Sequence, residues 1–196
     1  MTDAKRPYRM RERAKSQEET RQKIVEATMH LHEELGPRAT TIKAIAERAG
    51  VQRLTVYRHF PDETAVFQAC TSHWLDLNPL PDPAAWAGIE DPVARFEAAV
   101  SAFNAYYART SRMWAAAFRD VADVPALEEP MEQVAAYLEG LAAGLTSEFG
   151  ARVGEVRIGA TIRHVLHFPT WAHLDALGLS DEAKTELAVE WLCCGR

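Results

Sequence analysis

The chain has 196 residues, 47% of them hydrophobic, and a formal net charge of −6 at pH 7. This length and apolar content allow a substantial core, exclude an intrinsically disordered chain, and fit one small domain joined to a larger one. No apolar run reaches the ~18 residues of a membrane span, and the basic N-terminus lacks the apolar stretch of a secretory signal. We therefore expect a cytoplasmic protein with no membrane partner.

Three cysteines are present, Cys70, Cys193 and Cys194, and their spacing matches no metal site or disulfide framework. A reducing compartment fits this usage. The adjacent pair at the C-terminus is read either as a redox sensor or as an ordinary helix end.

Charge is distributed unevenly along the chain. Residues 1–60 hold 13 Lys and Arg against 8 Asp and Glu, whereas residues 61–196 hold 9 against 20. A basic segment attracts phosphate, and an acidic remainder discourages non-specific binding elsewhere. The first 15 residues lack apolar periodicity and contain six cations: Lys5, Arg6, Arg9, Arg11, Arg13 and Lys15. We expect residues 1–20 to be a mobile basic arm that reaches a groove of DNA or, alternatively, a solvated tail.

Residues 41–60 predict two short helices joined by a glycine turn. An apolar stripe at i, i+3, i+4 and i+7 begins at Ile42, and Thr41 is placed to cap the first helix. Gly50 suits the left-handed position that ends this helix. In the second helix Val56 and Phe60 face inward, because they lie one turn apart. This pattern is a helix-turn-helix, and it indicates DNA binding.

These residues resemble the tetracycline-repressor (TetR/AcrR) family of bacterial transcriptional regulators. The resemblance runs from IVEATMHLHEELG at 24–36 through TTIKAIAERAGV at 40–51 to VYRHF ending at residue 60. A weaker resemblance at 168–188 matches the family's last two helices. The family implies DNA contacts by the following residues: Thr41, Lys43, Gln52, Arg53, Leu54, Thr55, Tyr57 and His59. Their chemistry agrees, since Arg53 can donate to guanine, Leu54 can pack against a thymine methyl, and hydroxyls can hold phosphate.

The chain departs from the family pattern at three positions. Gln52 stands where a serine or threonine is usual, and Leu54 stands where a small residue is usual. Glu63 occupies the position of a lysine that contacts phosphate. The resemblance therefore implies neither an operator sequence nor a phosphate contact by residue 63.

The rest of the chain is predicted to be helical, which gives an all-α fold. A helix from about residue 62 to 77 precedes a loop at 78–92 with four prolines, and Asp91 and Pro92 read as the cap and first residue of the next helix. We divide the chain into a basic arm (1–20), a helix-turn-helix domain (21–67) and a helical effector-binding and dimerisation domain (68–196). The last two helices, about 155–177 and 180–194, are expected to pair with a second copy through Phe168, Trp171, Leu187 and Trp191.

The helical domain is rich in aromatic residues, which usually form core but here accompany polar anchors. The family implies a small-molecule effector pocket. The expected lining is Phe103, Tyr107, Arg109, Trp114, Phe118 and His164.

His164 and His167 lie at i, i+3, with His173 nearby, but no third ligand completes a metal site. No glycine-rich phosphate loop or nucleophile motif occurs, so neither an enzyme nor a cofactor is expected. The favoured reading is a dimeric, ligand-responsive repressor of a palindromic operator, released by a mostly apolar small molecule. The alternative is a helical small-molecule-binding protein or metal sensor whose helix-turn-helix is a packing relic.

Overall fold

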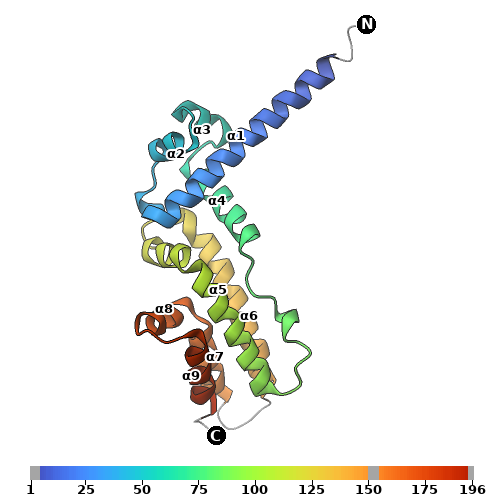
Figure 1. The fold of residues 1–196 in the computed structure, drawn as a ribbon, viewed down its shortest axis with the longest axis vertical. Coiled ribbons are helices and arrows are strands. Elements are labelled where there is room, and N and C mark those ends of the chain that lie inside the picture. The colour runs from blue at the N-terminus through green and yellow to red at the C-terminus, as the bar shows by residue number, and fades with distance from the viewer. Residues whose placement is uncertain (1–4, 150–154, 194–196) are drawn as a thin grey trace. The chain divides into compact units, whose positions relative to one another are not determined.

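The computed structural model describes residues 5–149 and 155–193, and every regular element in these ranges is helical (Figure 1). The predicted all-α fold is thereby confirmed. The α-helices of the described residues are α1 (Lys5–Leu35), α2 (Ile42–Ala49), α3 (Arg53–His59), α4 (Glu63–Leu77), α5 (Pro92–Asp120), α6 (Glu128–Ser147), α7 (Glu155–Leu166), α8 (Phe168–Ala176) and α9 (Asp181–Cys193). Short 3-10 turns join them: η1 (Pro37–Ala39), η2 (Pro83–Ala85) and η3 (Pro125–Leu127).

The chain forms two compact units that are not simply consecutive. Met1–Leu77 and Ala116–Glu128 make the first unit, and Asn78–Ala115 and Glu129–Arg196 make the second. Helix α5 contributes residues to both, because its last turn belongs to the first unit.

Helix α1 begins at Lys5, so most of the segment expected to be a mobile arm is helical instead. The reason is composition: residues 9–20 contain no Gly or Pro and are rich in Arg, Glu, Lys and Gln, all good helix formers. Pro7 lies in the first turn, where a missing N–H costs nothing. Apolar periodicity detects buried helix faces, and residues 10–19 are all exposed.

The core of the first unit lies between α1, α2, α3 and α4. Ile24 and Ile45 are fully buried there, together with Val56 and Val66. Helix α1 ends at Gly36, which has φ 91° and donates its N–H to the His32 carbonyl at 3.0 Å.

The core of the second unit is aromatic. The Tyr107 ring meets Phe168 and Trp171 at centroid distances of 5.3 and 6.0 Å, and its hydroxyl donates to the Leu166 carbonyl at 2.9 Å. Phe168 and Trp171 are 4% and 5% exposed, so the expectation that they form an exposed interface is wrong. Side chains of the same chain cover them, among them Tyr107, Trp114 and Lys184.

The expected helix over residues 155–177 is two helices. His167 has extended backbone (φ −83°, ψ 131°) and separates α7 from α8, with Pro169 in the first turn of α8. A proline in the first turn begins a helix, whereas in an interior it would remove a backbone hydrogen bond. At the end of α9, Cys193 is half-buried, and Cys194 lies outside the described residues.

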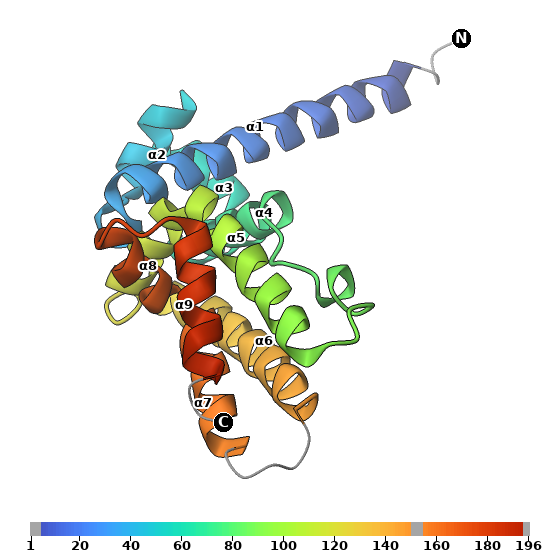
Figure 2. The ribbon, with the colours of Figure 1, turned by 60° about the horizontal axis from the view of Figure 1, so that its bottom comes forward.

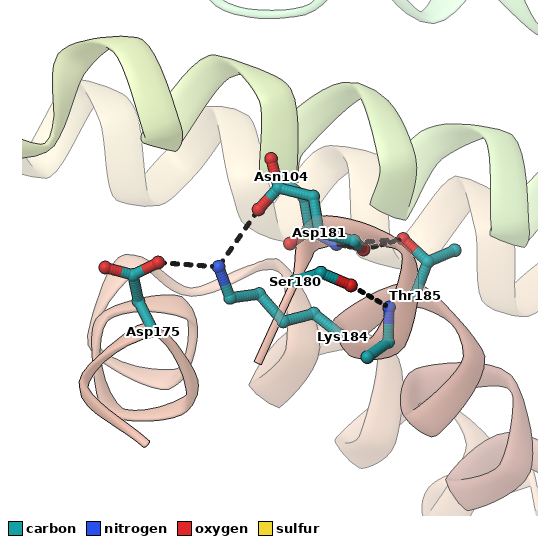
Figure 3. Close-up of polar contacts among 7 residues, drawn as sticks. Asn104, Asp175, Ser180, Asp181, Lys184 and Thr185 are labelled. Atoms are coloured by element: carbon teal, nitrogen blue, oxygen red, sulfur yellow. Dashed lines mark hydrogen bonds and ion pairs between the residues drawn. The ribbon is translucent and has the colours of Figure 1, made fainter. Parts of the chain in front are cut away.

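A buried cation attaches α9 to α8 (Figure 3). Lys184 is 3% exposed, and its ammonium donates to Asp175 at 2.8 Å and Asp181 at 2.9 Å. It also lies 4.6 Å from the centre of the Trp171 ring. Burial disfavours the charge, but the hydrogen bonds to the two carboxylates prevail, and the pKa of Lys184 lies above its ordinary value.

Candidate nucleic-acid interface

The turn between α2 and α3 is built as its residues predict. The Thr41 side chain accepts from the Ala44 N–H at 3.2 Å, which satisfies one free amide at the start of α2. Gly50 is left-handed (φ 68°, ψ 33°), and the Val51 N–H donates to the Ala46 carbonyl at 2.9 Å. These bonds close the end of α2 in the manner of a Schellman motif. Together they set the angle at which α3 leaves α2.

The side of α3 opposite the core is open to solvent. Val56 is fully buried and Phe60 is 3% exposed, whereas Leu54 and Tyr57 are 69% and 49% exposed. Arg53 is also exposed. A short helix with a guanidinium, an apolar side chain and a phenol on one face can donate hydrogen bonds to base edges in the major groove and pack against thymine methyl groups.

Two predicted contact residues, Thr55 and Lys43, already have partners within the chain. The Arg58 guanidinium donates to the Thr55 hydroxyl at 3.1 Å, and the Lys43 ammonium lies 3.7 Å from Glu47. Arg58 is exposed on α3 but is missing from the predicted contact set. Its place one residue after Tyr57, on the outward side of the helix, is the sequence signal that predicts its exposure.

A bidentate ion pair fixes α2 to α1. The Arg48 guanidinium donates to both carboxylate oxygens of Glu34, at 2.9 and 2.7 Å. Its hydrogen bonds to Glu34 raise the pKa of Arg48 above its ordinary value. This arginine therefore supports the framework of the domain rather than offering a free charge to DNA.

The six residues expected around an effector have different environments. Phe103, Tyr107 and Trp114 are buried and pack against one another, with the Tyr107 ring 5.7 Å from Phe103 and 6.2 Å from Trp114. The exposed Arg109 lies over the Tyr106 ring at 5.0 Å, and the exposed His164 ring lies 6.2 Å from Trp191. Phe118 is half-buried and belongs to the first unit.

The second unit contains a groove of about 510 Å³ that is lined by none of these six residues. One wall is a small-residue face of α6, formed by Ala136, Gly140 and Gly144, and a Cβ added at either glycine would meet nothing within 4 Å. Trp86 and Tyr137 contribute aromatic surface. The sequence signal for this groove is the repeat of a small residue every fourth position in α6.

The polar end of the groove is an ion pair. The Arg95 guanidinium lies 2.6 Å from Glu148 and also donates to the Ile89 carbonyl at 2.7 Å. Arg95 is the more buried partner, with 18% of its side chain exposed against 41% for Glu148.

Comparison with known proteins identifies the N-terminal domain. Residues 24–70 match the family model described as bacterial regulatory proteins, tetR family. The HTH-type transcriptional regulator SrpR of Pseudomonas putida is 39% identical over 75 residues, which cover 37% of this chain and 35% of SrpR. TtgW, another HTH-type regulator of Pseudomonas putida, is 37% identical over 75 residues, which cover 37% of this chain and 56% of TtgW. The N-terminal domain of the chain therefore matches the tetR family of bacterial regulatory proteins.

Solved structures share the fold of this chain over most of its length, whereas the match to SrpR and TtgW spans only part of each. A TetR-like regulator from Rhodococcus sp. RHA1 matches with a TM-score of 0.69 at 17% identity, covering 90% of this chain and 94% of the other. NalD of Pseudomonas aeruginosa matches with a TM-score of 0.59 at 20% identity, covering 92% and 97%. The recognition of the family from the helix-turn-helix is thus confirmed.

Two of the positions that depart from the TetR pattern have visible structural consequences. Gln52 begins α3 without a side-chain capping bond, and its side chain is exposed. Glu63 is exposed in the first turn of α4, while Asp62 caps that helix by accepting from the Ala65 N–H at 2.8 Å. Within the described residues, no helix combines the length and apolarity needed to cross a bilayer.

Proposed function

We propose that this chain is a repressor that binds a palindromic operator as a dimer and is released by a mostly apolar small molecule. The observation that carries the proposal is the exposed face of α3, where Arg53, Leu54 and Tyr57 point away from the core. NalD is described as the secondary repressor of the MexAB-OprM multidrug efflux pump. From NalD we carry over to this chain only the proposal that it represses rather than activates transcription.

The DNA-reading roles are tested with an operator selected from a pool of random duplexes. Arg53→Ala is expected to cost about 1–3 kcal/mol per half-site and to relax preference at one base pair, because a bidentate arginine reads guanine. Tyr57→Phe is the comparison variant, and it should weaken operator and random DNA alike. Equal losses on both DNAs for Arg53→Ala would show that Arg53 does not read bases.

We propose that dimerisation uses α7 and α9. Trp191 is 36% exposed and Val156 is 88% exposed, while Leu187 lies one turn before Trp191. Exposed apolar side chains on neighbouring helices mark an association surface, and a two-fold dimer presents two copies of α3 to a palindrome. Trp191→Glu is expected to give a monomer by light scattering at micromolar concentration. A parent protein that is already monomeric would contradict this arrangement.

For the effector we propose the groove beside α6. It is supported by its volume, which lies in the range of small-molecule sites, and by its apolar walls with one charged pair. Arg95 provides an anchor for an acidic group of the ligand if Glu148 turns toward solvent. The expected residues that lie in the second unit, around Tyr107, remain the other proposed location, supported by a buried Trp171 indole N–H with no acceptor among the described residues.

Two substitutions distinguish the locations. Gly144→Leu places a side chain in the groove and should abolish effector binding there, since nothing lies within 4 Å of the added Cβ. Phe103→Leu alters the aromatic core and should leave groove binding intact. If instead Phe103→Leu abolishes effector binding and Gly144→Leu does not, the effector binds at the aromatic residues.

A further inference from the structure

The N-terminal half of α1 has no role in the core of its unit. Among the described side chains of α1 the first fully buried one is Ile24, and residues 10–19 are exposed throughout. Lys5 to Thr20 make up 16 residues of regular helix, about 24 Å long at 1.5 Å per residue. We call these residues the α1 extension. In both ribbon views it runs beyond α2, α3 and α4 (Figures 1 and 2).

The charge of the α1 extension does not stabilise the helix itself. Between residues 5 and 20 the sequence has six Lys and Arg against three carboxylates, Glu12, Glu18 and Glu19, and all six cations lie in the first 11 of these residues. Pairs of opposite charge four residues apart support an isolated helix, and here one such pair, Lys15 and Glu19 at 3.9 Å, is formed among the described side chains. The remaining Lys and Arg side chains of the α1 extension repel one another along the helix. A polyanionic partner would offset that repulsion.

The extension leaves its unit beside the DNA-reading helix. The Arg21 guanidinium lies 4.8 Å from the centre of the Phe60 ring, and Phe60 is the residue that ends α3. On the other side, the Gln22 amide lies 3.1 Å from His73 of α4. Helix α1 is therefore held between α3 and α4 at the point where the extension begins, and its direction relative to α3 is fixed.

The helical register places a cation on the side that faces the domain. Arg13 precedes Ile24 by 11 residues and Leu31 by 18, which are close to three and five complete turns. Ile24 and Leu31 are buried against the rest of the unit. Arg13 therefore continues their face beyond the end of the core, on the side of α1 that faces the rest of its unit.

We propose that the α1 extension is a second DNA-contacting element, a rigid basic rod that lies along the phosphate backbone beside the base pairs read by α3. The proposal rests on the proposed DNA-binding function and adds a sequence-independent contact to it. At 3.4 Å per base step, a 24 Å helix reaches about 7 base pairs of flanking DNA. Arg11, Arg13 and Lys15 are its exposed cations among the side chains described.

The test needs no operator, because the contact is independent of sequence. Binding of the full chain to a random 40-base-pair duplex is measured by fluorescence anisotropy from about 50 to 200 mM KCl, and log K is plotted against log salt concentration. Neutralising the extension with Arg11→Gln, Arg13→Gln and Lys15→Gln together should make the slope shallower by about 0.9 for each phosphate that the extension no longer neutralises. Glutamine retains helix propensity, and circular dichroism checks that the helix remains.

A matched pair of single variants separates position from net charge. Arg13→Gln and Arg112→Gln change the same side chain at exposed positions, one in the extension and one in α5. Arg13→Gln should reduce the slope, and Arg112→Gln should leave it unchanged. Equal effects of the two, or an unchanged slope in the triple variant, would overturn the proposal.

Two further outcomes are distinguishable. If the parent chain binds no DNA at any salt concentration, the proposed function and the role of the extension fail together. If the parent binds DNA and the triple variant has the same salt slope as the parent, only the proposed role of the extension fails. Vesicles of phosphatidylglycerol and phosphatidylcholine serve as the membrane arm. Loss of vesicle binding in the triple variant, with its DNA slope unchanged, would overturn the DNA assignment in favour of a membrane surface.

Discussion

Single residues in this protein show how burial sets chemistry. His32 is 2% exposed and meets the Phe67 ring edge-on at a centroid distance of 4.4 Å. Its Nδ1 lies 3.7 Å from the Cys70 sulfur, and its Nε2 has no hydrogen-bond partner among the described residues. Burial lowers the pKa of His32 to about 4 and raises the pKa of Cys70 to about 12. The imidazole is therefore neutral and the thiol protonated at neutral pH.

The depressed pKa of His32 makes stability depend on pH. In the unfolded chain the imidazole has its ordinary pKa of 6.5 and takes up a proton as the pH falls from 6.5 to 4, whereas the folded protein does not. The unfolded state gains protons, so stability falls across this window and the effect levels off below about pH 4. The loss from His32 is up to about 3 kcal/mol, at about 1.4 kcal/mol per pKa unit.

Urea unfolding at pH 7 and at pH 4 measures this effect in the parent and in His32→Gln. The variant should lose about 3 kcal/mol less than the parent over the same interval, because its side chain does not titrate. The carboxylates titrate in both proteins and cancel in the comparison. Identical losses would mean that His32 is hydrated and charged in the folded state.

At the scale of helices, ends can be predicted from the sequence where the signal is local. Thr41 and Asp91 each accept from the backbone N–H three residues on, and Gly50 adopts the left-handed conformation that its position indicates. The beginning of α1 cannot be predicted by apolar periodicity, because an exposed helix has no buried face. The break at His167 escapes the sequence pattern because Pro169 fits an interruption within one helix as well as the first turn of another.

Gly36 and Gly50 end successive helices with positive φ and should respond differently to alanine. Gly50 (φ 68°) has open space around an added Cβ, so Gly50→Ala is expected to cost about 1–2 kcal/mol from conformation alone. At Gly36 (φ 91°, ψ 157°) the added Cβ would overlap the Arg119 guanidinium and the Asp120 carboxylate.

Asp120 explains why the Gly36 site cannot relax freely. It accepts from Arg119 at 2.8 Å and from the Arg38 N–H at 3.1 Å, and these bonds, that of Arg119 foremost, hold the pKa of this carboxyl below its ordinary value. Gly36→Ala should therefore destabilise the protein by at least about 1 kcal/mol more than Gly50→Ala in chemical unfolding. Equal costs would show that the Arg119 side chain moves aside.

The attachment of α9 gives a third prediction. Lys184→Ala removes the two ion pairs and the packing of the lysine stem, whereas Lys184→Met keeps most of the packing. The carboxylates of Asp175 and Asp181 are 52% and 42% exposed, so either variant leaves them solvated. Lys184→Ala should be less stable than Lys184→Met by about 2 kcal/mol in urea unfolding, at about 0.8 kcal/mol per buried methylene. If the two variants unfold alike, the ion pairs rather than the packing hold α9 in place.

For the whole molecule, the DNA-binding surface and the proposed effector site are not equally predictable from the sequence. The DNA-binding surface depends on contacts between near neighbours, such as Thr41 with Ala44, and its local pattern is visible in the sequence. The proposed effector site depends on which helices pack against one another. Phe103 and Tyr107 are expected in a pocket, and they are buried, but aromatic periodicity predicts burial without indicating which side chains or ligand cover them. Likewise, no pattern in the sequence indicates that residues 116–128 belong to the first unit.

Regulation requires that an effector distinguish two arrangements of the protein, since a ligand that binds both equally shifts neither. In a dimer, two copies of α3 must lie about 34–36 Å apart to enter successive major grooves. An effector in the second unit that favours another separation weakens DNA binding by the ratio of its two affinities. We expect a coupling of about 1–3 kcal/mol, or about 5–150-fold.

This mechanism predicts reciprocity. Calorimetric titration of the effector into free protein and into operator-bound protein should give dissociation constants that differ by the same factor by which the effector weakens operator binding. Gly144→Leu is the control if the groove is the site, because it should abolish effector binding and leave operator affinity unchanged. A compound that binds both forms equally cannot act through this equilibrium, whatever its affinity, and finding only such compounds would contradict release by an effector. A compound that binds free protein more tightly, and still does so in Gly144→Leu, would keep the mechanism and move the effector to the aromatic residues around Tyr107.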